Sequence, residues 1–223
     1  MTLTALSGVA SRQVFLAGSI HDALSGRAPW TQPSILLRFQ AAPQRPLALR
    51  LRHHLPTGLY AFYGDPRSAL PVLAAPDTLD LELVVSAPRY ATATVPISLT
   101  EADLQLVEPT REVEGQTVAL ARRPALPLLL DVLLAPLPLV LVGRVVRADD
   151  PSVAVVGASI AVTAPSPAGP VVSNPLGAYT LPDLPVAEEI TLQVTAAGFS
   201  TLTLTRRLDY RRPVNEQHFH LTT

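Results

Sequence analysis

One pattern of strand-forming residues occurs in both halves of the chain. Each copy contains an opening strand that begins with glycine, a Gly-x-Tyr sequence, an alternating apolar run and a short motif that ends in an aromatic residue. An internal repeat of this length predicts two domains with the same fold. The matching segments are 18–22, 58–60, 79–83 and 87–90 in the first half, and 143–147, 177–179, 190–194 and 197–199 in the second.

Short alternating runs indicate that both copies are made of β-strands. Apolar and polar residues alternate at 79–83, 190–194 and 201–205, which is the period of antiparallel strands with one buried face. The 23 prolines are scattered rather than clustered, which fits short strands joined by turns. The sequence therefore predicts an all-β protein of two tandem antiparallel β-sandwiches. Residues 100–107 alone predict a short helix, with Thr100 as its N-cap.

The two sandwiches are expected at residues 10–123 and 139–223. Between them, residues 124–138 are rich in proline and leucine and predict an apolar connector, so we expect the two domains to pack on each other. The apolar stretch 126–142 is interrupted by Asp131 and by prolines, which a membrane-spanning helix would not tolerate. We therefore expect this stretch to be extended and buried, with no membrane span.

Composition excludes several classes of function. Without cysteine the chain has no disulfide, no thiolate metal site and no cysteine nucleophile. A net charge of −1 gives no reason to expect nucleic acid as a partner. All of the basic side chains other than histidine are arginine, so the Lys–Asn isopeptide bond of pilin-like sandwich domains cannot form. No secretory signal is visible in residues 1–18, which favours synthesis and assembly in the cytoplasm.

Motifs in the second copy resemble those of a known domain family. They are Gly-x-Val at 143–145, Gly-x-Tyr-x-Leu at 177–181, Leu-Pro at 184–185 and an Ala-Gly-aromatic sequence at 197–199. Together they resemble the carboxypeptidase regulatory-like domain, and the first copy keeps a degenerate Gly-x-Tyr-x-Phe at 58–62. The resemblance implies two tandem transthyretin-like or Ig-like sandwiches with an accessory role, in which the glycines and aromatic residues of the motifs are structural.

His218 and His220 are the sharpest candidates for chemistry. Alternate residues of a strand share a face, so both imidazoles could bind one metal ion. Intradiol ring-cleaving dioxygenases share this broad class of sandwich and bind iron with two tyrosines and a His-x-His pair, which invites comparison with Tyr179 and Tyr210. Tyr210 lies only eight residues before His218, however, and Tyr179 belongs to the Gly-x-Tyr motif. We therefore predict a polar strand face, with no catalytic residue, no metal and no cofactor.

Trp30, Arg50 and Arg52 are the candidate interface residues. Trp30 lies in a proline-flanked loop, where it either plugs the end of the sandwich or anchors a partner. Arg50 and Arg52 alternate along a basic strand, which is either a site for an acidic partner or a solvated face. Longer loops in the first copy, within 63–76 and 100–115, offer further room for binding.

Low charge (16%), high apolar content (48%) and the lack of an active-site constellation favour a protein that is not an enzyme. We expect a structural or adaptor protein that contacts other protein subunits in a larger bacterial assembly, such as a phage-tail-like injection particle or a surface complex. A homo-oligomer is compatible with this prediction. The alternative is an accessory module that binds carbohydrate or another ligand, although only 5% of residues are aromatic. A metalloenzyme using His218 and His220 comes third.

Overall fold

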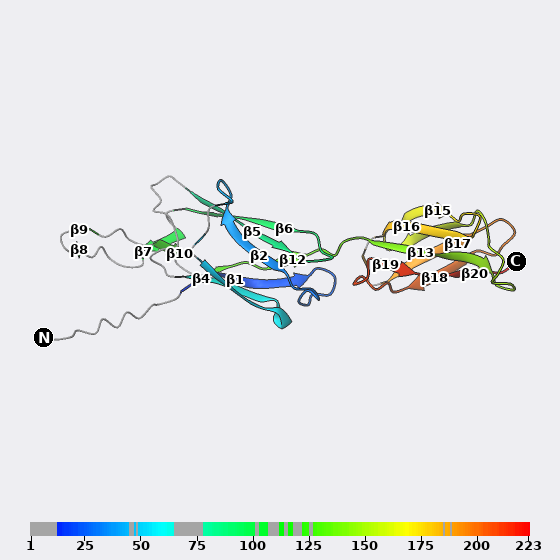
Figure 1. Cartoon of the computed structure of the whole chain (residues 1–223), viewed down its shortest axis with the longest axis horizontal. Helices are drawn as coiled ribbons and strands as arrows, with labels where there is room; N and C mark the ends of the chain where they lie inside the picture. The colour runs from blue at the N-terminus through cyan, green and yellow to red at the C-terminus, as the bar shows by residue number, and fades with distance from the viewer. Residues whose placement is uncertain are drawn as a thin grey trace. The chain divides into compact units, whose positions relative to one another are not determined.

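The protein is built almost entirely of β-strands, which confirms the predicted all-β class (Figure 1). The chain divides into two compact units, Met1–Leu134 and Ala135–Thr223. Among the described residues, no helix is long and apolar enough to cross a membrane. The computed structural model describes residues 13–44, 47, 49–64, 78–100, 103–106, 112–113, 116–117, 122–124, 127–184, 186–187 and 189–223.

The first unit contains two main sheets. One has the order β11-β1-β4-β3, with β12 also paired to β1, and the other has the order β2-β5-β6. Neighbouring strands are antiparallel, except that β11 and β12 run parallel to β1. The bounds are β1 (Gln13–Asp22), β2 (Ser34–Phe39), β3 (Leu49–His54), β4 (Leu59–Gly64), β5 (Leu79–Ser86), β6 (Ala93–Leu99), β11 (Leu128–Leu129) and β12 (Val132–Leu134), with a 3-10 turn, η1 (Leu55–Thr57), before β4.

Alternation along the strands produces the core of the first unit. In β5, Leu79, Leu81, Leu83 and Val85 are buried while the residues between them are less so. They pack in one cluster with residues of the facing sheet such as Leu16. Because one side of each sheet is apolar, stacking the two sheets removes both apolar faces from water at once.

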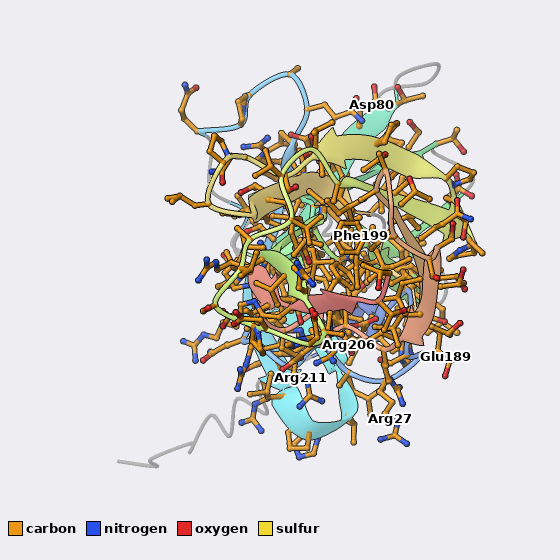
Figure 2. All side chains as sticks on the ribbon, turned by 90° about the vertical axis from the view of Figure 1, so that its right-hand side faces the viewer. Arg27, Asp80, Glu189, Phe199, Arg206 and Arg211 are labelled. Carbon is orange, nitrogen blue, oxygen red and sulfur yellow. The ribbon has the colours of Figure 1, made fainter. Side chains whose placement is uncertain are left out.

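The second unit repeats this architecture. Its sheets have the orders β16-β13-β19, with β20 also paired to β13, and β15-β14-β17-β18. In Figure 2, Phe199 lies among side chains towards the centre, whereas Glu189 and Arg211 lie towards the outside, in keeping with their exposure. The bounds are β13 (Leu139–Arg147), β14 (Ser159–Ala164), β15 (Ala168–Val172), β16 (Ala178–Leu184), β17 (Ile190–Thr195), β18 (Leu202–Arg206), β19 (Val214–Glu216) and β20 (Phe219–Leu221).

The predicted helix at 100–107 is wrong in its described part, because residues 104–106 form a strand. Thr100 is a donor here rather than the expected N-cap acceptor: its backbone N–H and its hydroxyl donate hydrogen bonds to the Asp103 carboxylate, at 2.8 and 2.7 Å. The chain then pairs with a later segment instead of winding into a helix. Residues 101, 102 and 107 lie outside the described residues. The small pairs are β7 (Leu104–Leu106) with β10 (Arg122–Pro124), and β8 (Glu112–Val113) with β9 (Gln116–Thr117).

The expected buried connector is also corrected by the structure. Residues 128–134 are strands of the first unit rather than a link that follows it, and they pair parallel to β1. Val132 and Leu134 are buried, whereas Leu129 and Leu133 are exposed. A continuous apolar run suggests a segment buried on both faces, but this strand has only one face against the core.

Both units share a break in the last strand, and it explains the glycine and tyrosine of the repeat. In the second unit the Tyr179 hydroxyl donates to the Gln217 carbonyl at 2.7 Å, and in the first the Tyr60 hydroxyl donates to the Leu130 carbonyl at 2.6 Å. A Cβ on Gly143 would lie 1.7 Å from the Gln217 oxygen, and one on Gly18 would lie 1.8 Å from the Leu130 oxygen. Glycine is required here because the carbonyl crosses directly over its Cα. The two halves are therefore two copies of the same structural unit.

A buried carboxyl group closes one end of the first sandwich. Asp22, at the end of β1, is 1% exposed. Its Oδ2 accepts a hydrogen bond from the Tyr90 hydroxyl at 2.7 Å, and its Oδ1 accepts from the backbone N–H groups of Leu24 and Ser25 at 2.8 and 3.0 Å. These partners satisfy the carboxyl oxygens, which would otherwise be costly to bury.

Candidate interaction surface

The outward side of the first unit's β11/β12-β1-β4-β3 sheet is the candidate site, and we call it the outer face. The pairing register places its side chains in rows across the strands. Residues opposite one another in adjacent strands share a side of the sheet. The rows are Val14, Tyr63 and Arg50; Leu129, Ala17, Ala61 and Arg52; Ser19, Leu59 and His54; and Leu133 with His21.

The outer face is apolar along one edge and basic along the other. Leu129 is 82% exposed, Leu133 is 65% exposed and Leu59 is 54% exposed. The small side chains of Ala17 and Ala61 separate Leu129 from Arg52 in the same row. Single exposed apolar residues are ordinary, whereas several gathered on one side of one sheet suggest a contact surface.

The second unit provides an internal comparison for this apolar edge. Aligning the two units on Gly18 and Gly143 places Glu216 and His220 where the first unit has Leu129 and Leu133. Both Glu216 and His220 are exposed. The same strand arrangement is therefore compatible with polar residues at these places, and the leucines of the first unit are not demanded by the fold.

The predicted interface residues Arg50 and Arg52 lie at the other edge of the outer face, on β3. Both are exposed. The Arg52 guanidinium lies 5.8 Å from the centre of the Tyr63 ring, within the range of a cation–π contact. Neither arginine pairs with a carboxylate in the part of the chain that the structure describes, unlike Arg38, whose Nε lies 2.5 Å from Glu82 Oε1. An acidic partner would be complementary to these two exposed charges.

Asp131 lies between the two exposed leucines in sequence and ties the last strand to β1. Its Oδ1 accepts hydrogen bonds from the backbone N–H and the hydroxyl of Ser19, at 2.8 and 2.6 Å. These two hydrogen bonds lower the pKa of Asp131 below its ordinary value of 3.8, and the bond from the Ser19 hydroxyl has the larger effect. The ionised form is favoured because both donors stabilise the negative charge.

We expect Asp131→Asn to reduce the pH dependence of the first unit's stability. Because the folded-state pKa is lowered, the carboxylate stabilises the fold above pH 3.8, and this contribution is lost as the pH falls through the lower folded-state value. The substitution should therefore lower the melting temperature near neutral pH and change it less at about pH 2. Melting curves across this range test the expectation, and an equal loss at both ends would contradict it.

His218 and Tyr179 both have hydrogen-bond partners within the protein. His218 Nδ1 accepts a hydrogen bond from the Arg144 backbone N–H at 3.1 Å, and Nε2 lies 3.0 Å from Glu216 Oε1. With Nδ1 as acceptor, Nε2 carries the proton and points it at Glu216. Tyr179 is buried, and its hydroxyl is bound to a backbone carbonyl. In the described residues, no group of three or more His, Cys, Asp or Glu side chains could hold a metal ion.

Trp30 lies outside the outer face. It is half-buried, packs against the first core, and its ring centre is 6.2 Å from that of Tyr90. This position corresponds to a plug on the sandwich core, the first of the two expected roles. A role for Trp30 in an interface stays a prediction.

Sequence reasoning missed the exposed pair Leu129 and Leu133. Their run was interpreted as buried because it is almost continuously apolar. Asp131 was the available signal: residues 129, 131 and 133 share one side of a strand, and an aspartate in the middle marks that side as solvent-exposed.

Comparisons with known proteins give only distant likenesses. No protein-family model and no curated protein matches the chain. Among solved structures, it is similar to the Bacillus anthracis TIE protein, with 10% identity, a TM-score of 0.37, and coverage of 93% of this chain and 34% of that one. It is also similar to BcpA, the major pilin subunit of Bacillus cereus, with 6% identity, a TM-score of 0.33, and coverage of 95% of this chain and 60% of that one. With the C-terminal fragment of the pilus adhesin SpaC from Lactobacillus rhamnosus GG it shares 12% identity and a TM-score of 0.31, with coverage of 93% of this chain and 97% of that one. The chain spans about a third of the TIE protein and about three fifths of BcpA.

Proposed function

We propose that the chain is a non-catalytic structural or adaptor protein whose first unit binds another protein subunit through the outer face. The observation that carries this proposal is the set of exposed leucines on the outer face, Leu129 and Leu133 at the edge formed by β11 and β12 and Leu59 on β4, because the second unit has polar residues at the places of the first two. Fully covering a leucine stabilises a complex by about 1.5–3 kcal/mol. An edge of exposed arginines is also typical of interfaces, in which arginine is enriched.

The wider setting is part of the same proposal. A bacterial assembly such as a phage-tail-like injection particle or a surface complex, put together in the cytoplasm, would use a stable accessory sandwich of this kind. We further propose that both units are of the carboxypeptidase regulatory-like type, because the Gly-x-Tyr motif has the same structural role in each. A carbohydrate-binding module stays the alternative prediction, and within the described strands Tyr63 is the one aromatic residue of the outer face.

A photo-crosslinking amino acid at residue 129 tests the proposal in the native host. We expect it to trap a specific protein, identified by mass spectrometry, and the trapping to fall when Arg52 is replaced by glutamate. The matched control carries the same amino acid at residue 216, the equivalent place in the second unit, and should trap none. Equal trapping from both places, or from neither, would exclude the outer face as the contact.

The double variant Leu129→Ser, Leu133→Ser separates binding from folding. Because both side chains are exposed, its unfolding free energy should stay within about 0.5 kcal/mol of the parent. Recovery of the crosslinked partner with the tagged protein should fall strongly. A large drop in the melting temperature would mean that the leucines serve the fold, and the proposal would then lose its basis.

A further inference from the structure

Strand β3 leaves one backbone edge open. It is the last strand of its sheet, and no described strand pairs with its far side. An open edge presents unpaired N–H and C=O groups that can template another strand. Among the described edge strands, β6, β10, β15 and β16 each contain a proline, which cannot donate to such a pairing, whereas β3, like β2 and β18, contains none. The prolines are Pro96, Pro124, Pro170 and Pro182.

A groove lies beside this open edge. Its volume is about 330 Å³, and it lies where β3 and β2, the edge strands of the two sheets, line the same hollow. Leu51 is 38% exposed and Leu36 is 48% exposed, so apolar surface borders the hollow on both strands. The described residues that line it are Leu36, Leu37, Arg38, Pro43, Gln44, Leu47, Leu49, Leu51 and Phe62.

Charge and apolarity alternate along β3. Leu49 and Leu51 line the groove, whereas Arg50, Arg52 and His54 point to the outer face. A strand added to β3 would therefore meet Leu49 and Leu51 with side chains on one side and the two arginines with side chains on the other. The complementary sequence is an extended segment of alternating apolar and acidic residues.

We propose that β3 is a docking edge for such an acidic, alternating segment of a partner protein, which adds to the sheet as a further strand. This inference rests on the proposed protein-binding function and shares Arg50 and Arg52 with the outer face, but it adds the backbone edge of β3 and the groove and does not use the exposed leucines. Backbone hydrogen bonds would provide the affinity. Contacts with the groove and with the arginines would provide the specificity for the partner.

A second copy of this chain does not fit the edge. Two β3 strands paired antiparallel, with their outer faces on the same side, would bring the arginines of both copies opposite one another, and like charges in that position are destabilising. A nucleic acid would satisfy the charges but not the backbone edge, so it is an outcome that the test has to distinguish.

A short, capped peptide of alternating valine and glutamate is the probe, added to the full chain. We expect saturable binding that weakens as salt is added, together with slower amide hydrogen exchange in residues 49–54. Slower exchange is the decisive result, because strand addition protects backbone N–H groups and side-chain contact alone does not. The same peptide with lysine in place of glutamate should not bind. Binding without protection of β3, equal binding of both peptides, or no binding would overturn the proposal.

The double variant Arg50→Glu, Arg52→Glu should weaken binding of the glutamate peptide by about tenfold. Arg27→Glu is the matched control, an exposed arginine of the same unit outside β3, and should leave binding unchanged. A thymidine oligonucleotide should neither bind with β3 protection nor displace the peptide; displacement would assign the edge to nucleic acid instead. The proposed function is tested separately: it fails if crosslinking from residue 129 traps no specific protein, whatever the result with the peptide.

Discussion

Replacing Gly143 with alanine should destabilise the second unit by about 3 kcal/mol or more. The added Cβ would lie 1.7 Å from the Gln217 carbonyl oxygen and 3.0 Å from the Tyr179 ring. The first of these atoms belongs to the backbone, so the strand pair β13 with β19 and β20 would have to separate at the point where Tyr179 is hydrogen-bonded. Urea unfolding followed by circular dichroism, with the transition of the second unit resolved, measures the loss.

Gly157→Ala is the matched control for this substitution. Gly157 has a φ of +73°, but a Cβ there would meet no atom within 4 Å. Its replacement carries only the cost of the left-handed conformation, about 1–2 kcal/mol. At Gly143 the φ is ordinary, and a substitution meets only the clash with the Gln217 carbonyl. Comparing the two variants therefore separates the cost of backbone strain from the cost of a steric clash. If Gly157→Ala is the more damaging variant, the close approach of the Gln217 carbonyl is not what holds position 143 as glycine.

Asp22→Ala should cost the first unit about 3–5 kcal/mol. The substitution removes three hydrogen bonds at once from a site that is 1% exposed. It also deprives the backbone N–H groups of Leu24 and Ser25 of their acceptor. Asp22→Asn should be milder, since the remaining amide oxygen can still accept from these two groups. Thermal melting of both variants measures the difference.

Asp80→Ala provides the surface comparison for Asp22. The Asp80 carboxylate also accepts hydrogen bonds, from the hydroxyls of Ser98 and Thr78 at 2.5 and 3.1 Å, but at a solvent-accessible place on β5. Water can replace those partners, so the expected cost is about 1 kcal/mol or less. Equal losses from Asp22→Ala and Asp80→Ala would show that burial does not govern the contribution of the Asp22 network.

Local patterns in the sequence were sufficient for the fold class, because alternation records which side of a strand is dry. The runs 79–83 and 190–194 became β5 and β17 with the apolar side inward. The same reasoning failed at 104–106, which form a strand instead of the predicted helix, because pairing with a distant segment decides the outcome there. It failed again at 128–134, because an almost continuously apolar run is typical of a strand buried on both sides, and Asp131 was its one local sign of an exposed side.

The candidate site was only half accessible to the same reasoning. Arg50 and Arg52 were chosen because basic residues alternate along one strand, and they do lie on the outer face. Leu129 and Leu133 were not predicted, because their place on that face depends on pairing with β1, more than a hundred residues earlier in the chain.

The sequence by itself determined that two copies of one β-sandwich would form, because the period of the strands and the Gly-x-Tyr sequence depend on neighbouring residues. Only the tertiary structure decided that the last strand of each copy runs parallel to the first, and that a backbone carbonyl crosses over Gly18 and Gly143. It also decided which leucines face water. These features arise from contacts between segments far apart in the chain, and such contacts leave no periodic trace in either segment alone.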